Sequence, residues 1–219
     1  MTERRDRGVV LAGGDSTRFG ERDKALARVD GTPMVRRAFD ALADATDTSP
    51  AVAAGTHPPV EYRRVLPSDV RFVPDADGRT GPLAGLAAAV DALDADWLFA
   101  AATDLPHLDA ATVAWLADER TPSCDAVVPV AADGVLQPLC AWYRSDAVAD
   151  ALASVPRTAG PRALLDHLTI QRVTSADAPA AVALDDALTN VNTSSQFDAL
   201  DSCSSTEDST GTSPSSNSR

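Results

Sequence analysis

Short apolar runs alternate along the chain with stretches of helical periodicity. Residues 9–12 are apolar and are followed by Gly13-Gly14, which predicts a buried strand that enters a turn. We expect Thr32 to cap the next helix and Pro33 to be its first residue. The apolar positions of that helix recur at helical spacing: Met34, Val35, Ala38, Phe39 and Leu42. The chain is therefore predicted to open as strand, glycine loop and helix.

The same alternation continues to about residue 173. Apolar runs predict further strands at residues 51–55, 71–73, 97–102, 126–128, 139–143 and 170–173. Helical spacing predicts helices at residues 83–93, 109–116 (capped by Asp109), 147–155 and 162–168. Strands that alternate with helices favour an α/β fold, in which a parallel or mixed sheet is covered on both faces.

Composition separates the chain into two parts. Residues 1–200 are expected to form one domain. Residues 201–219 are mostly Ser, Thr, Asp and Asn, which predicts a disordered tail because such a segment buries too little apolar surface.

No apolar run reaches the ~18 residues of a membrane span, and the charged N-terminus precedes only four apolar residues. We therefore expect a cytoplasmic protein without a membrane anchor.

The charge of the chain excludes some partners. The formal net charge is −13 and the pI is about 4.5, so nucleic acid and anionic lipid would be repelled. Arginine supplies 18 of the 19 basic residues, and aspartate supplies 27 of the 32 acidic ones. This bias resembles proteins of a salt-rich cytoplasm, and an acidic protein from a GC-rich genome is the alternative. In either case Lys24 is the single lysine.

The strongest chemical signal follows the first predicted strand. Residues 11–20 read LAGGDSTRFG, and residues 23–26 read DKAL. Backbone N–H groups of a glycine turn approach an anion closely, and Arg18 and Lys24 add two cations, so we expect a cradle for a polyphosphate. The loop is not a Walker A motif, because no Gly-Lys-Ser/Thr follows, and it lacks the Gly-x-Gly-x-x-Gly dinucleotide fingerprint.

A carboxylate follows the predicted strand at residues 97–102. Asp104 comes two residues after that strand, and ligands of open α/β sheets bind at the carboxyl ends of strands. Next to a phosphate cradle, Asp104 is placed to hold Mg²⁺ that bridges triphosphate oxygens. The alternative interpretation is an aspartate that caps the next turn or helix.

A third motif lies on the loop before the helix at residues 83–93. Gly81 and Gly85 flank the start of that helix and would let a base or ribose lie against the backbone. Asp75 can accept hydrogen bonds from base N–H groups or ribose hydroxyls. Close helix packing through small residues is the alternative explanation, above all for Gly85.

A fourth motif lies near residue 190. Asn190 and Asn192 are two residues apart, so both amides point the same way on an extended chain and can recognise a pterin or another polar heterocycle. A helix cap at Thr193 or Ser194 is the alternative, and both explanations can hold at once. Gln137 is a weaker candidate of the same kind.

Together, these motifs resemble the molybdenum cofactor guanylyltransferase family over roughly residues 8–200. The shared features are the glycine loop with its Asp-Lys-Ala-Leu, the GPLAG string at residues 81–85, the D-x-P at residues 104–106 and the N-V-N-T at residues 190–193. The resemblance implies a Rossmann-like, three-layer nucleotidyltransferase fold with a mostly parallel sheet. It also implies an enzyme that uses GTP and Mg²⁺ to attach GMP to Mo-molybdopterin and releases pyrophosphate.

The resemblance also implies roles for individual residues. Catalytic roles fall to Arg18, Lys24 and Asp104, and Asp104 would also hold the metal. The implied nucleotide contacts are Leu11, Ala12, Gly13, Gly14, Lys24, Asp75 and Asp104, and the implied acceptor contacts are Asn190 and Asn192. The residue patterns described above add Gly81 to the expected nucleotide contacts and Gln137 to the expected acceptor contacts. Beyond its substrates, such an enzyme would make at most transient contact with molybdenum cofactor enzymes or insertion proteins.

The sequence departs from the family pattern at three positions. Ala53-Ala54 stands where many members place an asparagine near the base, Asp15 follows the double glycine, and Thr103 replaces a frequent cysteine. Two alternatives therefore stay open: a CMP transferase of the same fold, acting on molybdopterin or an alcohol phosphate, and a nucleotide-binding regulator without turnover. The joint presence of Lys24 and Asp104 argues against the regulator, because binding alone needs only one strong phosphate anchor.

Overall fold

A seven-stranded sheet forms the middle of the molecule in the computed structural model, which describes residues 5–13, 23–46 and 48–191. In spatial order its strands are β5 (Arg71–Val73), β4 (Ala51–Ala53), β1 (Asp6–Leu11), β6 (Trp97–Ala102), β8 (Cys140–Arg144), β7 (Ala126–Pro129) and β9 (Ile170–Val173). Within this sheet β8 runs antiparallel to both of its neighbours, and every other pairing is parallel. The predicted mostly parallel α/β fold is confirmed.

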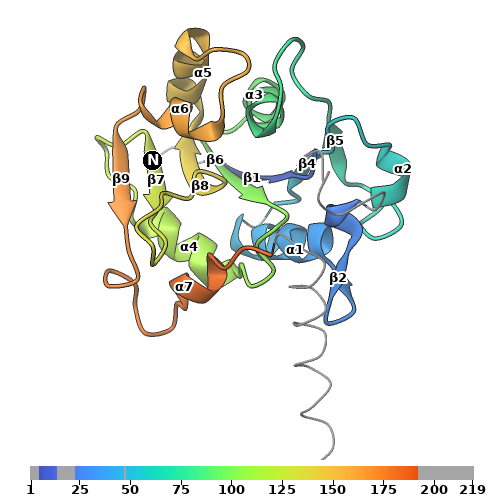
Figure 1. Cartoon of the computed structure of the whole chain (residues 1–219), viewed down its shortest axis with the longest axis horizontal. Helices are drawn as coiled ribbons and strands as arrows, with labels where there is room; N and C mark the ends of the chain where they lie inside the picture. Colours follow the sequence, from blue (N-terminus) through green and yellow to red (C-terminus); the bar gives the residue numbers. More distant parts are fainter. Residues whose placement is uncertain (1–4, 14–22, 47, 192–219) are drawn as a thin grey trace, which may run out of the picture.

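Helices cover both faces of the sheet and complete three layers (Figure 1). One face packs against α1 (Met34–Thr46) and α4 (Ala110–Asp118), and the other against α3 (Pro82–Ala92), α5 (Ser145–Ser154) and α6 (Pro161–Leu165). The sequence pattern did not predict the short elements η1 (Lys24–Leu26), α2 (Pro59–Tyr62) and α7 (Leu184–Ala187). None of the described helices is long and apolar enough to cross a bilayer.

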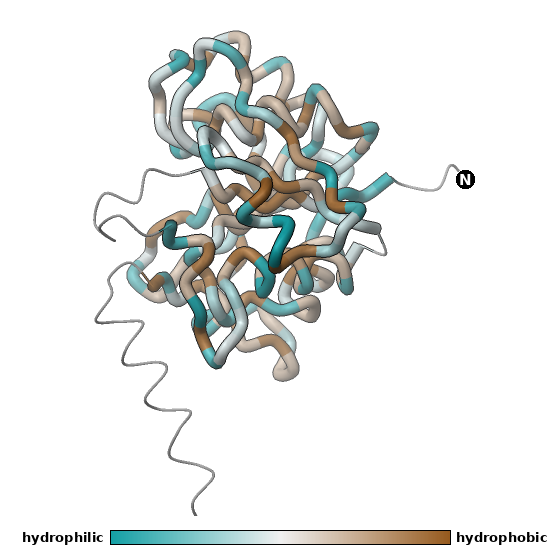
Figure 2. The backbone as a smooth tube through the Cα atoms, turned by 90° about the vertical axis from the view of Figure 1, so that its right-hand side faces the viewer, coloured by the Kyte–Doolittle hydropathy of each residue, from teal (hydrophilic) through white to brown (hydrophobic). Residues whose placement is uncertain are grey.

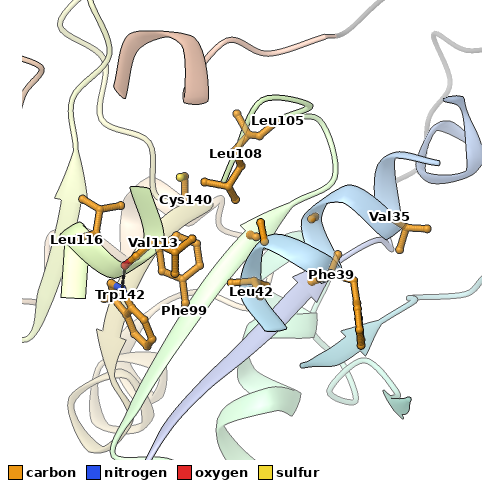
Figure 3. Packing of buried hydrophobic residues seen from close by; sticks show 14 of the residues in the cluster. Val35, Phe39, Leu42, Phe99, Leu105, Leu108, Val113, Leu116, Cys140 and Trp142 are labelled. Carbon is orange, nitrogen blue, oxygen red and sulfur yellow. Dashed lines mark hydrogen bonds between the residues drawn. The ribbon is translucent and has the colours of Figure 1, made fainter. Parts of the chain in front are cut away.

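Alternate strand residues supply the two cores. In β1, Val10 joins the cluster under α1 and α4, while Val9 and Leu11 join the cluster under α3 and α5, as the twofold repeat of a strand requires. Figure 3 shows Phe39 and Leu42 of α1 facing the same layer as Phe99 and Trp142 of the sheet. The colour along the chain changes between hydrophobic and hydrophilic over short distances, as expected for elements with one buried face (Figure 2).

The predicted start of the first helix is wrong. Thr32–Pro33 form a short strand, β3, that pairs antiparallel with β2 (Arg28–Val29), and α1 begins at Met34. The turn between the two strands consists of Asp30 and Gly31, with φ angles of 50° and 73°. Asp-Gly is a favoured pair for such a two-residue hairpin turn. The chain therefore forms a hairpin here instead of the capped helix start that we expected. By contrast Asp109 caps α4 as predicted, because its side chain accepts a hydrogen bond from the Thr112 N–H.

The strand order reverses at β1. From β1 the chain crosses to β4 and β5 on one side, and it then returns to β6 on the other side of β1. The last residue of β1, Leu11, is paired with Ala53 at the end of β4 and with Ala102 at the end of β6. Ligands of open α/β sheets bind in the crevice that opens at such a reversal, beyond the carboxyl ends of the strands.

Candidate active site

Two charged side chains meet where β1 and β6 end. Because Leu11 and Ala102 are paired, the segments that follow them, Ala12-Gly13 and Thr103-Asp104, leave the sheet side by side. The Nζ atom of Lys24 lies 3.5 Å from Oδ2 of Asp104. The structure thus brings together the cation and the carboxylate that the sequence analysis assigned to one phosphate site.

Lys24 and its counter-charge are both partly buried. Its side chain is only 14% exposed and that of Asp104 is 28% exposed. Burial lowers the pKa of the Lys24 ammonium, and the charge and hydrogen bond of Asp104 oppose this shift. A bound polyphosphate would compensate the buried ammonium in place of Asp104, which would leave the carboxylate to a cation.

The packing of two loops requires a glycine at residue 13. A Cβ atom at this position would lie 2.6 Å from Cα and 2.7 Å from N of Gly55, in the loop after β4. The Ala12 N–H also donates to the carbonyl oxygen of Ala53 at 2.8 Å. Two loops therefore touch through their backbones beside the site, and a side chain at residue 13 would separate them.

Asp75 lies at the same edge of the sheet. A Cβ atom on Gly85 would lie 2.8 Å from the Ala53 Cβ, 3.1 Å from Cδ2 of Leu11 and 3.5 Å from Oδ1 of Asp75. Close packing of α3 on the strands therefore accounts for Gly85, which was the alternative explanation in the sequence analysis. Burial raises the pKa of the Asp75 carboxyl. Gly81 precedes α3 as its exposed N-terminal cap residue.

Two arginines that the sequence analysis missed fasten the loop that carries Asp75. The Arg79 guanidinium donates to the carbonyl oxygens of Leu152 at 2.9 Å and Pro156 at 3.4 Å, at the end of α5. Arg157 donates to the Asp77 carbonyl oxygen at 2.8 Å. The loop between β5 and α3 is thus tied to the connection between α5 and α6, a contact between segments more than 70 residues apart that no local pattern could reveal.

A cavity of about 470 Å³ opens on the other side of Asp104. The hydrogen bond from the Val191 N–H to the Asp104 carbonyl oxygen, 3.0 Å, places Asn190 in its wall. Its lining contains two predicted acceptor contacts, Gln137 and Asn190, and an exposed arginine that the sequence analysis did not single out, Arg162. The full lining is Ala102, Asp104, Leu105, Val135, Leu136, Gln137, Pro138, Leu139, Gly160, Pro161, Arg162 and Asn190.

Asp104 therefore connects Lys24 with the cavity. It pairs with Lys24 on the side of the glycine loop, and it lines the cavity on the side of Asn190. Lys24 and Asp75 do not line that cavity. Three predicted site residues lie outside the described part of the chain: Gly14, Arg18 and Asn192.

The metal-ligating side chains of the candidate site suit a cation that is held mainly by the phosphates of a nucleotide. In the described residues no group of three or more His, Cys, Asp or Glu side chains is arranged to hold a metal ion. Mg²⁺ in phosphate-transfer sites takes one or two carboxylates together with substrate phosphates, rather than a cage built entirely of protein ligands. The partly exposed Asp104 beside Lys24 fits this mode.

The mostly parallel sheet with a candidate site at its strand reversal, together with a match to a family model of NTP transferases, defines an α/β nucleotidyltransferase. The chain belongs to the family described as "MobA-like NTP transferase domain", whose model matches residues 8–173. The family predicted from the motifs is thereby confirmed.

Relatives and solved structures agree with this assignment. The chain is 32% identical over 179 residues to a protein of Natronomonas pharaonis named "Probable molybdenum cofactor guanylyltransferase", covering 75% of this chain and 83% of the relative. It is 30% identical over 196 residues to a Bacillus anthracis protein of the same name, covering 87% and 92%. The molybdopterin-guanine dinucleotide biosynthesis protein A of Archaeoglobus fulgidus superposes with a TM-score of 0.71 at 19% identity, covering 91% and 98%. A Mycobacterium tuberculosis protein in complex with manganese superposes with a TM-score of 0.64 at 22% identity, covering 91% and 98%.

Proposed function

We propose that the protein is a cytoplasmic molybdenum cofactor guanylyltransferase that transfers GMP from GTP to Mo-molybdopterin and releases pyrophosphate. One observation carries this proposal: Asp104 contacts Lys24 of the nucleotide loop and also lines the cavity that holds Asn190 and Gln137. A group-transfer enzyme needs its two substrates to meet at one point, and Asp104 occupies the boundary between the two halves of the site.

The nucleotide half lies over β1, β4 and β5. Backbone N–H groups of the loop that begins at Leu11 would hold the phosphates, together with Lys24 and the predicted Arg18. Asp75 would accept hydrogen bonds from the base or ribose, and Gly81 would let the nucleoside approach the backbone. The base would receive no polar side-chain contact from the end of β4, because Ala53 and Ala54 are buried apolar residues there.

The acceptor half is the cavity beyond Asp104. The side-chain amides of Gln137 and Asn190, with that of the predicted Asn192, would form hydrogen bonds with the polar edge of the pterin. Arg162 would bind the acceptor phosphate, because a guanidinium matches the geometry of two phosphate oxygens. The acceptor phosphate would then lie close to Asp104, where the nucleotide is held.

The reaction requires placement and charge neutralisation more than covalent help. An oxygen of the acceptor phosphate attacks the α-phosphorus of GTP in line, the bond to the pyrophosphate oxygen breaks, and pyrophosphate leaves. The acceptor phosphate is already ionised, so no strong general base is needed. Lys24 stabilises the charge that develops on the leaving pyrophosphate. Mg²⁺ held by Asp104 and phosphate oxygens would supply further neutralisation of the phosphates.

Mass spectrometry of the product tests the proposal and its alternatives. The protein is incubated with molybdopterin, Mg²⁺ and an equal mixture of the four nucleoside triphosphates at high KCl. A product heavier by GMP supports the proposal, and a product heavier by CMP replaces it with the cytidylyl alternative. Nucleotide binding without a product or pyrophosphate would favour the regulator. A thermal-shift series should show stronger stabilisation by GTP than by CTP.

A further inference from the structure

Tyr62, the last residue of α2, connects two parts of the nucleotide half. Its side chain is fully buried, and its hydroxyl lies 2.5 Å from Oδ2 of Asp23 and 3.3 Å from the carbonyl oxygen of Ala12. Asp23 directly precedes Lys24, and Ala12 directly follows β1. One hydroxyl group therefore reaches both the segment that leaves the sheet and the segment that carries the single lysine.

The carboxylate of Asp23 links Tyr62 to the short helix that begins at Lys24. Its second oxygen, Oδ1, accepts a hydrogen bond from the Ala25 N–H at 2.9 Å and so caps the short helix η1, of which Lys24 is the first residue. The direction in which Lys24 leaves the backbone is thus set by Asp23, and Asp23 is held from its other side by Tyr62.

The tyrosine ring has little freedom to move. It stacks on the Phe72 ring of β5, with ring centroids 6.3 Å apart. It also packs against the His57 ring in a T-shaped arrangement, with ring centroids 6.4 Å apart. Burial and the hydrogen bond to Asp23 raise the pKa of Tyr62, so its hydroxyl keeps its proton and can donate it at neutral pH. A rigid ring with a protonated hydroxyl is a fixed anchor for a carboxylate.

We propose that Tyr62 is a positioning residue that, through Asp23, aims Lys24 at the phosphates of the nucleotide. The inference rests on the proposed phosphate-binding role of Lys24. The competing explanation is that Tyr62 only fills the core under β4 and β5. The two explanations differ in what the hydroxyl alone does, because Tyr62→Phe keeps the ring and removes one oxygen atom.

The chain offers a matched control for this substitution. It contains two tyrosines, and the second, Tyr143, is also fully buried and donates through its hydroxyl to the Pro138 carbonyl oxygen at 2.6 Å. Tyr143 lies in the cluster on the opposite face of the sheet from Tyr62. Tyr143→Phe should therefore cost stability for the same reason as Tyr62→Phe without disturbing Lys24.

The first measurement uses Lys24 itself and needs no substrate. Each variant is treated with N-hydroxysuccinimide acetate, and acetylation of Lys24 is followed by peptide mass spectrometry, separately from the N-terminal amine. Tyr62→Phe should raise the rate about three- to tenfold, the consequence of losing one hydrogen bond. Tyr143→Phe should leave the rate unchanged. Equal rates in the wild type and both variants would overturn the inference, whatever reaction the protein catalyses.

A second variant keeps the test decisive if Tyr62→Phe does not fold. Asp23→Ser retains an oxygen that can cap the Ala25 N–H, but it is too short to reach the Tyr62 hydroxyl. On its own it should raise Lys24 acetylation about three- to tenfold, and an unchanged rate in Asp23→Ser would contradict the proposal. Where Tyr62→Phe does fold, the double variant should show no further increase, because both changes break the same contact. Additive increases in the double variant would contradict the proposal.

Calorimetric titration with GTP and Mg²⁺ links the geometry to function. Tyr62→Phe should weaken GTP binding about tenfold, the scale of a lost charge-assisted hydrogen bond, while Tyr143→Phe should not. In turnover assays the loss should appear in the KM for GTP, with the KM for the acceptor unchanged. If the wild type binds GTP but transfers no GMP, the proposed function fails while the role of Tyr62 is still measured.

Discussion

Lys24 and Asp104 are 80 residues apart in the chain, and their side chains meet 3.5 Å apart where β1 and β6 end. An ammonium that is only 14% exposed needs a counter-charge, and Asp104 provides one in the protein without substrate. The same two groups are those that we propose to hold the nucleotide phosphates and a cation. In that proposal the nucleotide phosphates would replace Asp104 as the partner of Lys24.

The first prediction concerns Lys24. Lys24→Ala should reduce turnover by about 10²-fold or more, the usual loss when one electrostatic donor to a transition state is removed. Lys24→Arg restores the charge but not the compact shape, and it should remain about tenfold below the wild type. Pyrophosphate release with GTP, Mg²⁺ and acceptor measures both. Arg64→Ala, at an exposed position, is the control, and near-normal turnover of Lys24→Ala would exclude the assigned role.

The second prediction uses the titration of Asp75. Burial raises the pKa of its carboxyl in the folded protein, so the folded state binds this proton more tightly than the unfolded chain does. Stability therefore falls as the pH rises from the unfolded value, about 3.9, through the raised folded value, and the penalty is full above it. Asp75→Asn should raise the Tm at pH 7, with a smaller gain near pH 4, and should weaken GTP binding. Calorimetric melting at both pH values checks the sign, and a lower Tm at pH 7 would show that the carboxylate is stabilising instead.

The third prediction compares alanine substitutions at two glycines, Gly13 and Gly160. A Cβ at Gly13 would lie 2.6 Å from a backbone atom of Gly55, so Gly13→Ala should lower the Tm and abolish most GTP binding. A Cβ at Gly160 would have no atom within 4 Å, and φ is −78° there, so Gly160→Ala should melt like the wild type. Thermal melting with and without GTP measures both variants. Equal Tm values for the two would mean that the loops after β1 and β4 do not make the close contact described above.

The fourth prediction concerns Arg79, which holds the Asp75 loop against the end of α5. Arg79→Ala removes hydrogen bonds to the Leu152 and Pro156 carbonyl oxygens and should raise the KM for GTP about tenfold with little change in kcat. The loop would still carry Asp75 but would spend less time in the binding position. Steady-state kinetics measures the effect, with Arg64→Ala again as the control. A loss confined to kcat would indicate that Arg79 acts on the reaction rather than on binding.

Local patterns predicted most of the elements and failed where local signals compete. Residues 97–102 form β6 within the predicted bounds, and Asp109 caps α4 as expected. Thr32-Pro33 matched a helix start, but the Asp30-Gly31 turn placed both residues in a hairpin instead. Strands, helix caps and two-residue turns depend on interactions within a few residues. For this reason a local sequence pattern can predict them.

The glycine loop, its single lysine and the aspartate after β6 predicted a site for phosphates and a metal from the sequence alone, because phosphate binding depends on a short run of backbone and charge. The tertiary structure decided which of these groups meet. The contacts of Tyr62 with Asp23, of Arg79 with Leu152 and of Asp104 with the cavity wall all join segments that are distant in the chain. Such contacts follow from the order of strands in the sheet, and strand order is set by the packing of the whole chain rather than by any local pattern.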